Sequence, residues 1–292
     1  MSTLPPSLET DQSRDRRADR QALLDAPAAL RFWHLASLDA PTVAVVWTFA
    51  FAWMCHIHLP LWLPVVLAIA AWCFYVADRL LDARNANTPL RARHHFHWRH
   101  RRIFVPLAII AALAAIALVA RSMPFAARER NSVLAAAALV YFTSVHSPWR
   151  VAAPKFRFPK ELLVGVLFTL ACAIPTLSRV GSSRLLAALP TILILIALAW
   201  LNCHAIESWE SDFPGRPTVF RLALALAATA LLATFATSLY DLRQAILLGM
   251  ASLSAVLLAG LDHKSLSLTP IALRSCADLA LLTPLLVLVI RV

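Results

Sequence analysis

Glycine and charge are both scarce in this chain of 292 residues. It has only five glycines, 15% of its residues are charged, 60% are hydrophobic, and its mean hydropathy is +0.69. Soluble globular domains carry about 25% charged residues, so this composition excludes that class. Because the apolar runs are rich in Ala and Leu and poor in Gly, they favour helices over the short alternating strands of a membrane barrel.

The cysteines and the N-terminal residues exclude two further features. Five cysteines occur without any CxxC spacing, so the sequence indicates neither a disulfide framework nor a zinc site. The first 35 residues lack an apolar core followed by a small-residue cleavage site, so we expect no cleavable signal peptide. We expect residues 1–36 to form a polar cytoplasmic segment, in which 19–36 make a short interfacial helix.

Long apolar runs fill the remaining sequence. A helix needs about 20 mostly apolar residues to span a bilayer. We therefore expect an all-α, polytopic membrane protein whose residues 37–292 form a bundle of nine transmembrane helices. The nine ranges are about 38–56, 59–77, 103–121, 129–146, 161–178, 185–203, 219–239, 244–261 and 271–290.

The basic residues predict the orientation of the bundle. The formal net charge is +11, and with the N-terminus in the cytoplasm 20 of the 27 Lys and Arg residues lie inside. This asymmetry follows the positive-inside rule and predicts an external C-terminus, in a membrane such as the bacterial inner membrane. Because the rule accounts for the positive charge, we expect no nucleic-acid partner.

Two acidic clusters follow apolar runs on the predicted cytoplasmic side. Asp78 and Asp82 follow the second run, and Glu207, Glu210 and Asp212 follow the sixth. Carboxylates are costly beside hydrocarbon, so their placement there suggests a function. The function that fits best is to hold Mg²⁺ against a phosphorylated substrate. The alternative for the first cluster is neutralisation by neighbouring arginines in ordinary salt bridges.

Basic and polar residues on the same side complete a candidate substrate site. Arginine forks and lysine charges suit a diphosphate, although the positive-inside bias alone explains several of them. The candidate substrate-binding residues are Arg79, Tyr141, Lys155, Arg157, Lys160, Asn202 and His204.

Two further polar groups stand out. The His- and Arg-rich segment 91–102 can bind metal, but its arginines favour an interfacial helix that contacts anionic lipid headgroups and is compatible with a cap over the site. Arg274 and Asp278 interrupt the last apolar run at a spacing that allows them to pair with each other, and we expect them to shape the substrate chamber.

Together these motifs resemble the UbiA superfamily of intramembrane prenyltransferases, from the Ser-Leu-Asp-Ala-Pro stretch at 37–41 to the last helix. The resemblance implies a helical bundle around a central cavity and Mg²⁺ held by both acidic motifs. It also implies a prenyl diphosphate that ionises to an allylic cation, which a lipophilic or aromatic acceptor attacks. On this reading Asp78, Asp82, Glu207 and Glu210 are the catalytic residues.

The sequence departs from the family pattern in the motifs themselves. Phe74 and Tyr75 stand where the family's first motif has an Asn-Asp pair, and the acids of the second motif have a shifted spacing before Gly215-Arg-Pro-Thr218. An alternative is therefore a protein of this fold without transferase activity, acting as a transporter or as a lipid- or isoprenoid-binding protein.

Overall fold

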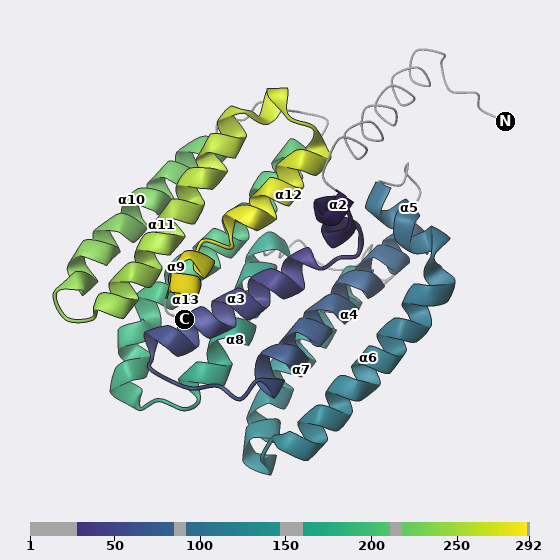
Figure 1. Ribbon diagram of the computed structural model, residues 1–292, viewed down its shortest axis with the longest axis horizontal. Helices are drawn as coiled ribbons and strands as arrows, with labels where there is room; N and C mark the ends of the chain where they lie inside the picture. Colours follow the sequence, from purple (N-terminus) through teal and green to yellow (C-terminus); the bar gives the residue numbers. More distant parts are fainter. Residues whose placement is uncertain (1–27, 85–91, 147–159, 211–217, 291–292) are drawn as a thin grey trace.

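The computed structural model describes residues 28–84, 92–146, 160–210 and 218–290, and within these ranges all regular secondary structure is helical (Figure 1). The elements are α2 (Ala28–Leu35), α3 (Asp39–Met54), α4 (Trp62–Arg84), α5 (Ala92–Arg99), α6 (Arg101–Ser122), α7 (Phe125–His146), α8 (Lys160–Leu177), α9 (Ser182–Trp209), α10 (Thr218–Ser238), α11 (Leu242–His263), the 3-10 turn η2 (Ser265–Ser267), α12 (Pro270–Ala280) and α13 (Leu285–Ile290).

Six of these helices are long and apolar enough to cross a membrane: α4, α6, α8, α9, α10 and α11. The outer helix α6 buries only Ala115 and exposes Ile109, Ile110, Leu113 and Ile116, an apolar face that suits lipid. The chain is therefore a membrane protein. The other predicted spans are also helical, but α3 has only 16 residues, so the count of nine transmembrane helices stays a prediction.

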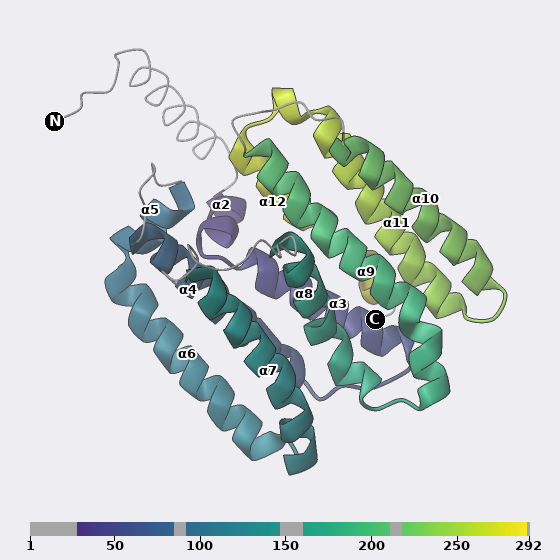
Figure 2. The same ribbon diagram turned by 180° about the vertical axis from the view of Figure 1, so that it is seen from behind.

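Helix α3 lies at the centre of the bundle. It packs against α4, α8, α11 and α12, and its Trp47 and Phe51 side chains are fully buried. The Trp47 indole Nε1 donates to the Leu281 carbonyl oxygen at 2.9 Å, which ties the first long helix to the last part of the chain. Helices α6 and α10 flank the bundle on opposite sides (Figure 2).

Helices α8 and α9 approach each other closely at Gly165. A Cβ atom built there would lie 2.9 Å from the Ile196 carbonyl oxygen and 3.0 Å from the Trp200 backbone nitrogen. Small residues allow helix backbones to meet in this way in membrane proteins. Gly165 therefore sets the position of α9, which carries several candidate site residues.

The last apolar run differs from the continuous helix expected over 271–290. It is split into α12 and α13 by a turn at 281–284. The physical reason is Pro284, which lacks a backbone N–H and whose ring clashes with the preceding turn of a helix. The Thr283 hydroxyl stabilises the turn by donating to the Met250 carbonyl oxygen at 2.8 Å and contacting the Ser254 hydroxyl at 2.7 Å.

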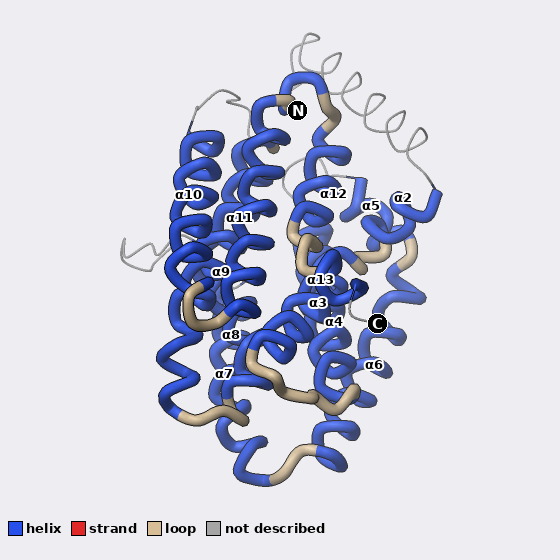
Figure 3. The backbone as a smooth tube through the Cα atoms, turned by 60° about the vertical axis from the view of Figure 1, so that its left-hand side comes forward, coloured by secondary structure: helices blue, strands red, loops and turns tan. Residues whose placement is uncertain are grey.

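Successive long helices run antiparallel, so α4 and α9 both finish at the end of the bundle where α3 begins (Figures 1 and 3). Helices α2 and α5 also lie there, and we call it the α5 end. Helix α4 continues to Arg84 and α9 to Trp209, so Asp78, Asp82 and Glu207 all lie on helices at this end. The described residues of both acidic clusters therefore lie at one end of the bundle, and which side of the membrane that end faces stays a prediction.

Candidate functional site

The turn between α2 and α3 begins the site by holding a histidine against an aspartate. Ser37 adopts a left-handed conformation, with φ of 60°, which reverses the chain between the two helices. The Trp72 indole Nε1 donates to the Ala36 carbonyl oxygen at 2.9 Å and fixes the turn to α4. As a result the imidazole Nδ1 of His34 lies 3.1 Å from Asp39 Oδ2, and both side chains are buried.

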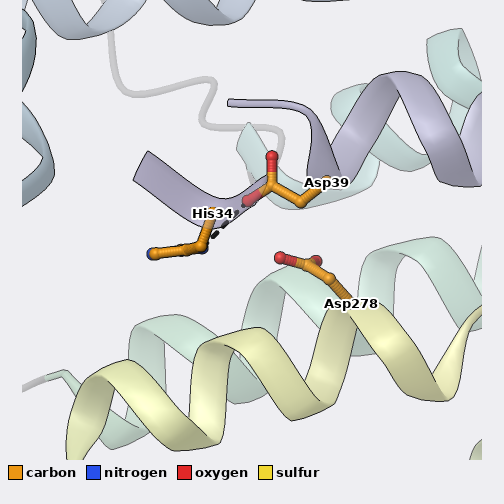
Figure 4. A group of neighbouring side chains, drawn as sticks. All are labelled: His34, Asp39 and Asp278. Carbon is orange, nitrogen blue, oxygen red and sulfur yellow. Dashed lines mark hydrogen bonds and ion pairs between the residues drawn. The ribbon is translucent and has the colours of Figure 1, made fainter. Parts of the chain in front are cut away.

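Helix α12 brings a second carboxylate to this pair. Figure 4 shows the Asp278 carboxylate directed toward the Asp39 carboxylate across the gap between α12 and the start of α3. One ligand atom from each of His34, Asp39 and Asp278 lies within 4.8 Å of the other two. The Asn202 amide Nδ2 on α9 donates to Asp278 Oδ1 at 3.3 Å. Four elements thus converge on one cluster.

Arg79 on α4 lies beside the cluster and is 1% exposed. Its Nη2 atom is 4.0 Å from Asp39 Oδ2, and its guanidinium lies over the Tyr75 ring at 5.6 Å from the centroid. Neither Nη1 nor Nη2 has a hydrogen-bond acceptor within the described part of the chain. An unsatisfied buried donor costs about 1–3 kcal/mol, and more when it is charged. Arg79 is therefore a strong candidate to bind an anion.

Two more arginines meet at Glu210. Arg93 on α5 donates to both carboxylate oxygens, at 3.0 and 3.5 Å, and Arg274 on α12 donates to Oε1 at 3.4 Å. Burial lowers the pKa of Arg93 to about 10, and Glu210 opposes that shift, so the guanidinium stays charged at neutral pH. Arg274 Nε has no acceptor among the described atoms. The structure therefore pairs Arg274 with Glu210, whereas the sequence spacing predicted Asp278 as its partner.

Helix α5 is fastened over the α5 end by a buried histidine. His97 Nδ1 lies 2.9 Å from the Arg93 carbonyl oxygen, and its Nε2 lies 3.1 Å from the Ser37 hydroxyl. Because a carbonyl only accepts, Nδ1 carries the proton and Nε2 accepts from Ser37. Burial lowers the pKa of His97 to about 4, and burial also lowers the pKa of His34 despite its bond to Asp39. Both imidazoles are therefore neutral at pH 7.

The four described acids of the predicted magnesium site contact different partners. Asp82 is exposed and lies 3.7 Å from His94 Nε2, while Glu207 is exposed and shares a hydrogen bond with the Glu161 carboxyl. Asp78 is half-buried on α4, and Glu210 is bound by two arginines. In the described ranges, the cluster with three close potential metal ligands contains none of these four. Magnesium binding at these acids therefore stays a prediction.

The predicted substrate-binding residues are only partly brought together. Arg79 and Asn202 belong to the buried cluster, whereas the His204 ring stacks on Trp200 at 5.5 Å between centroids. Tyr141 is half-buried on the peripheral helix α7, and Lys160 is exposed at the start of α8. Three further predicted site residues lie outside the described part of the chain: Lys155, Arg157 and Asp212.

The sequence did not predict the roles of His34, Asp39 and Arg93 in the site, and it placed Arg274 at the substrate chamber without its bond to Glu210. A signal was available only for Asp39 and Arg274, because an ionisable residue inside an apolar run usually faces the protein interior. Comparison with family models, with curated proteins and with solved structures gave no match to this chain.

Proposed function

We propose that this protein is an integral membrane prenyltransferase that binds a prenyl diphosphate at the α5 end and transfers the prenyl group to a lipophilic or aromatic acceptor. The observation that carries the proposal is the buried Arg79 guanidinium, two of whose nitrogens have no hydrogen-bond acceptor in the described structure. Phosphate oxygens are suitable acceptors for such a fork. The motif resemblance to the UbiA superfamily supports the same substrate class.

The residues at the α5 end suit the departure of a diphosphate. The allylic C–O bond breaks, the diphosphate leaves with the electron pair, and Arg79 with Arg274 stabilises the negative charge it carries. The acceptor then attacks the allylic cation and loses a proton. Apolar helices around the site exclude the water that would otherwise capture the cation. Helix α5, fastened through Arg93 and His97, closes the site toward the aqueous side.

The membrane placement forms part of the proposal. Nine spans in a bacterial inner membrane, with the N-terminus in the cytoplasm and the C-terminus outside, would put the α5 end on the cytoplasmic side, where water-soluble diphosphates are made. Segment 91–102 would then contact anionic lipid headgroups through its exposed basic residues, such as Arg101 and Arg102.

A second candidate function is isoprenoid or lipid binding, or transport, without transfer chemistry. The observation that favours it is the pairing within the cluster, where Arg93 and Arg274 already bind Glu210 and Arg79 lies beside Asp39. The replacement of the family's Asn-Asp pair by Phe74 and Tyr75 points the same way. In this second candidate function the protein binds the isoprenoid or lipid but does not catalyse a transfer.

Binding and turnover of geranylgeranyl diphosphate by the purified protein in lipid nanodiscs test the proposal. We expect Arg79→Gln to weaken binding at least tenfold. Arg84→Gln, which removes an exposed arginine from the same helix, should bind like wild type. Equal binding by wild type and Arg79→Gln would refute the proposal. Tight binding without diphosphate release, across a panel of phenolic and lipid acceptors, would establish the second candidate in its place.

A further inference from the structure

We infer that His34, Asp39 and Asp278, together with the side-chain amide oxygen Oδ1 of Asn202, form a divalent-cation site at the α5 end. The cation assigned here lies between the start of α3 and α12, away from the acids at the ends of α4 and α9. The existence of the cation site is independent of the proposed function, whereas the role of the cation beside a diphosphate rests on it.

The donor atoms of the three side chains lie close enough together to bind one cation. One atom each from an imidazole and two carboxylates lies within 4.8 Å of the others, and Figure 4 shows the two carboxylates facing each other. Metal–ligand bonds of about 2.0–2.2 Å place neighbouring ligands roughly 3–4 Å apart. The widest pair, at up to 4.8 Å, would therefore have to close by roughly 1–2 Å to complete the site. If Nδ1 of His34 is the ligand, its proton must move to Nε2.

Asn202 supplies an independent observation. Its side chain is 6% exposed, and its Oδ1 atom has no hydrogen-bond partner within the described residues. The Nδ2 atom of the same amide donates to Asp278 Oδ1 at 3.3 Å, so the unpartnered oxygen lies near the Asp278 carboxylate. An amide oxygen is an ordinary ligand for a hard cation. A bound cation would satisfy this buried acceptor.

The charge of the cluster explains why a cation is needed. Arg79, Arg93 and Arg274 are balanced by Asp39, Glu210 and Asp278, so the described site is close to neutral. A diphosphate ester brings roughly two to three negative charges into this buried place. Burying that charge without compensation is strongly unfavourable. A divalent cation offsets most of it.

The position of Asp39 links the cation to Arg79. Asp39 Oδ2 lies 3.1 Å from His34 Nδ1 and 4.0 Å from Arg79 Nη2. When Asp39 ligates a cation, its negative charge is shared with the metal and its hold on Arg79 weakens. The guanidinium is then available to phosphate oxygens. Cation and diphosphate should therefore bind cooperatively, each increasing the affinity for the other.

The mixture of donors favours a transition metal. Imidazole suits Zn²⁺, Fe²⁺ and similar ions, whereas carboxylate and amide oxygens suit Mn²⁺ and Mg²⁺. Mn²⁺ accepts both nitrogen and oxygen donors and can be observed directly by electron paramagnetic resonance, which makes it a suitable probe.

The test measures Mn²⁺ binding to metal-free protein in nanodiscs, without any prenyl diphosphate. We expect one tight Mn²⁺ per chain and a nitrogen coupling from one imidazole in the pulsed spectrum of the wild type. Asp278→Asn and His34→Gln should each weaken binding at least tenfold. Glu129→Gln, an exposed carboxylate change on α7, should leave it unchanged. Retained wild-type affinity in both site variants, or a spectrum without nitrogen coupling, would overturn the inference.

Asp82→Asn separates this site from the acids at the end of α4. If Asp82→Asn abolishes Mn²⁺ binding while Asp278→Asn retains it, the cation lies on the α4 acids and the inference is wrong. A wild type that binds Mn²⁺ with the imidazole coupling but shows no affinity for geranylgeranyl diphosphate would instead refute the proposed function. Because His94 lies 3.7 Å from Asp82, the nitrogen coupling should also disappear in His34→Gln and persist in His94→Gln; the opposite result would overturn the inference.

Discussion

Replacing Gly165 by alanine tests how closely α8 and α9 must pack. The new methyl group would lie 2.9 Å from the Ile196 carbonyl oxygen, whereas ordinary Cβ contacts begin near 3.4 Å, so the helices must separate by about 0.5 Å. The obstructing atoms belong to the backbone of α9, which cannot rotate away as a side chain can. Overpacking of this kind costs about 1–3 kcal/mol. We expect the apparent melting temperature to fall by roughly 3–10 °C.

Gly260→Ala is the matched control, because a Cβ atom on Gly260 of α11 meets nothing within 4 Å. Alanine in a helix interior is favoured over glycine by about 0.5–1 kcal/mol, so this variant should be as stable as wild type or slightly more stable. Both variants are compared by thermal unfolding in the same detergent. If Gly165→Ala unfolds at or above the temperature of Gly260→Ala, the close backbone contact between α8 and α9 is wrong.

Two further predictions concern α5. The pKa of His97 is about 4 in the folded protein and near 6.5 in an unfolded chain, so its contribution to stability is complete above pH 6.5 and is lost as the pH falls toward 4. The loss reaches up to about 3 kcal/mol, and melting curves between pH 7.5 and 4.5 should show a smaller pH dependence for His97→Gln than for wild type. Arg93→Gln removes the two-point bond to Glu210 and should raise hydrogen exchange in α5 about tenfold, whereas Arg99→Gln, an exposed change on the same helix, should not. Equal exchange in the two arginine variants would contradict the role of Glu210 as the anchor.

The helical class and the shared side of the acidic clusters follow from the sequence because both depend on local properties. Apolar runs of adequate length specify helices, and alternating direction brings every second helix end to the same side of the bundle. The helix break at 281–284 is harder to predict from the sequence. Pro284 interrupts the helix there, whereas Pro106, Pro175 and Pro190 lie within helices that continue. The effect of a proline depends on whether neighbouring groups satisfy the freed carbonyl, which is a tertiary property.

The buried cluster was harder to predict because its contacts join distant parts of the chain. Spacing rules suggest that Arg274 pairs with Asp278 on the same helix, yet Arg274 binds Glu210 and Asp278 accepts a hydrogen bond from Asn202. Local spacing contains no information about partners 64 and 76 residues away. His34 was overlooked for the same reason, since its environment depends on the turn at Ser37 and on α12.

The buried cluster contains residues from both ends of the polypeptide, and this has a consequence for biosynthesis. Asp39 is made early, whereas Asp278 and Arg274 enter the membrane only after nearly all the other helices. The Trp47 bond to Leu281 likewise joins residues 234 positions apart. Until α12 has been synthesised, Asp39 and Arg79 therefore lack Asp278 and Arg274 as neighbours. The charged centre can be completed only late in synthesis, and a nascent chain that stalls before α12 leaves the Asn202 amide without its carboxylate partner.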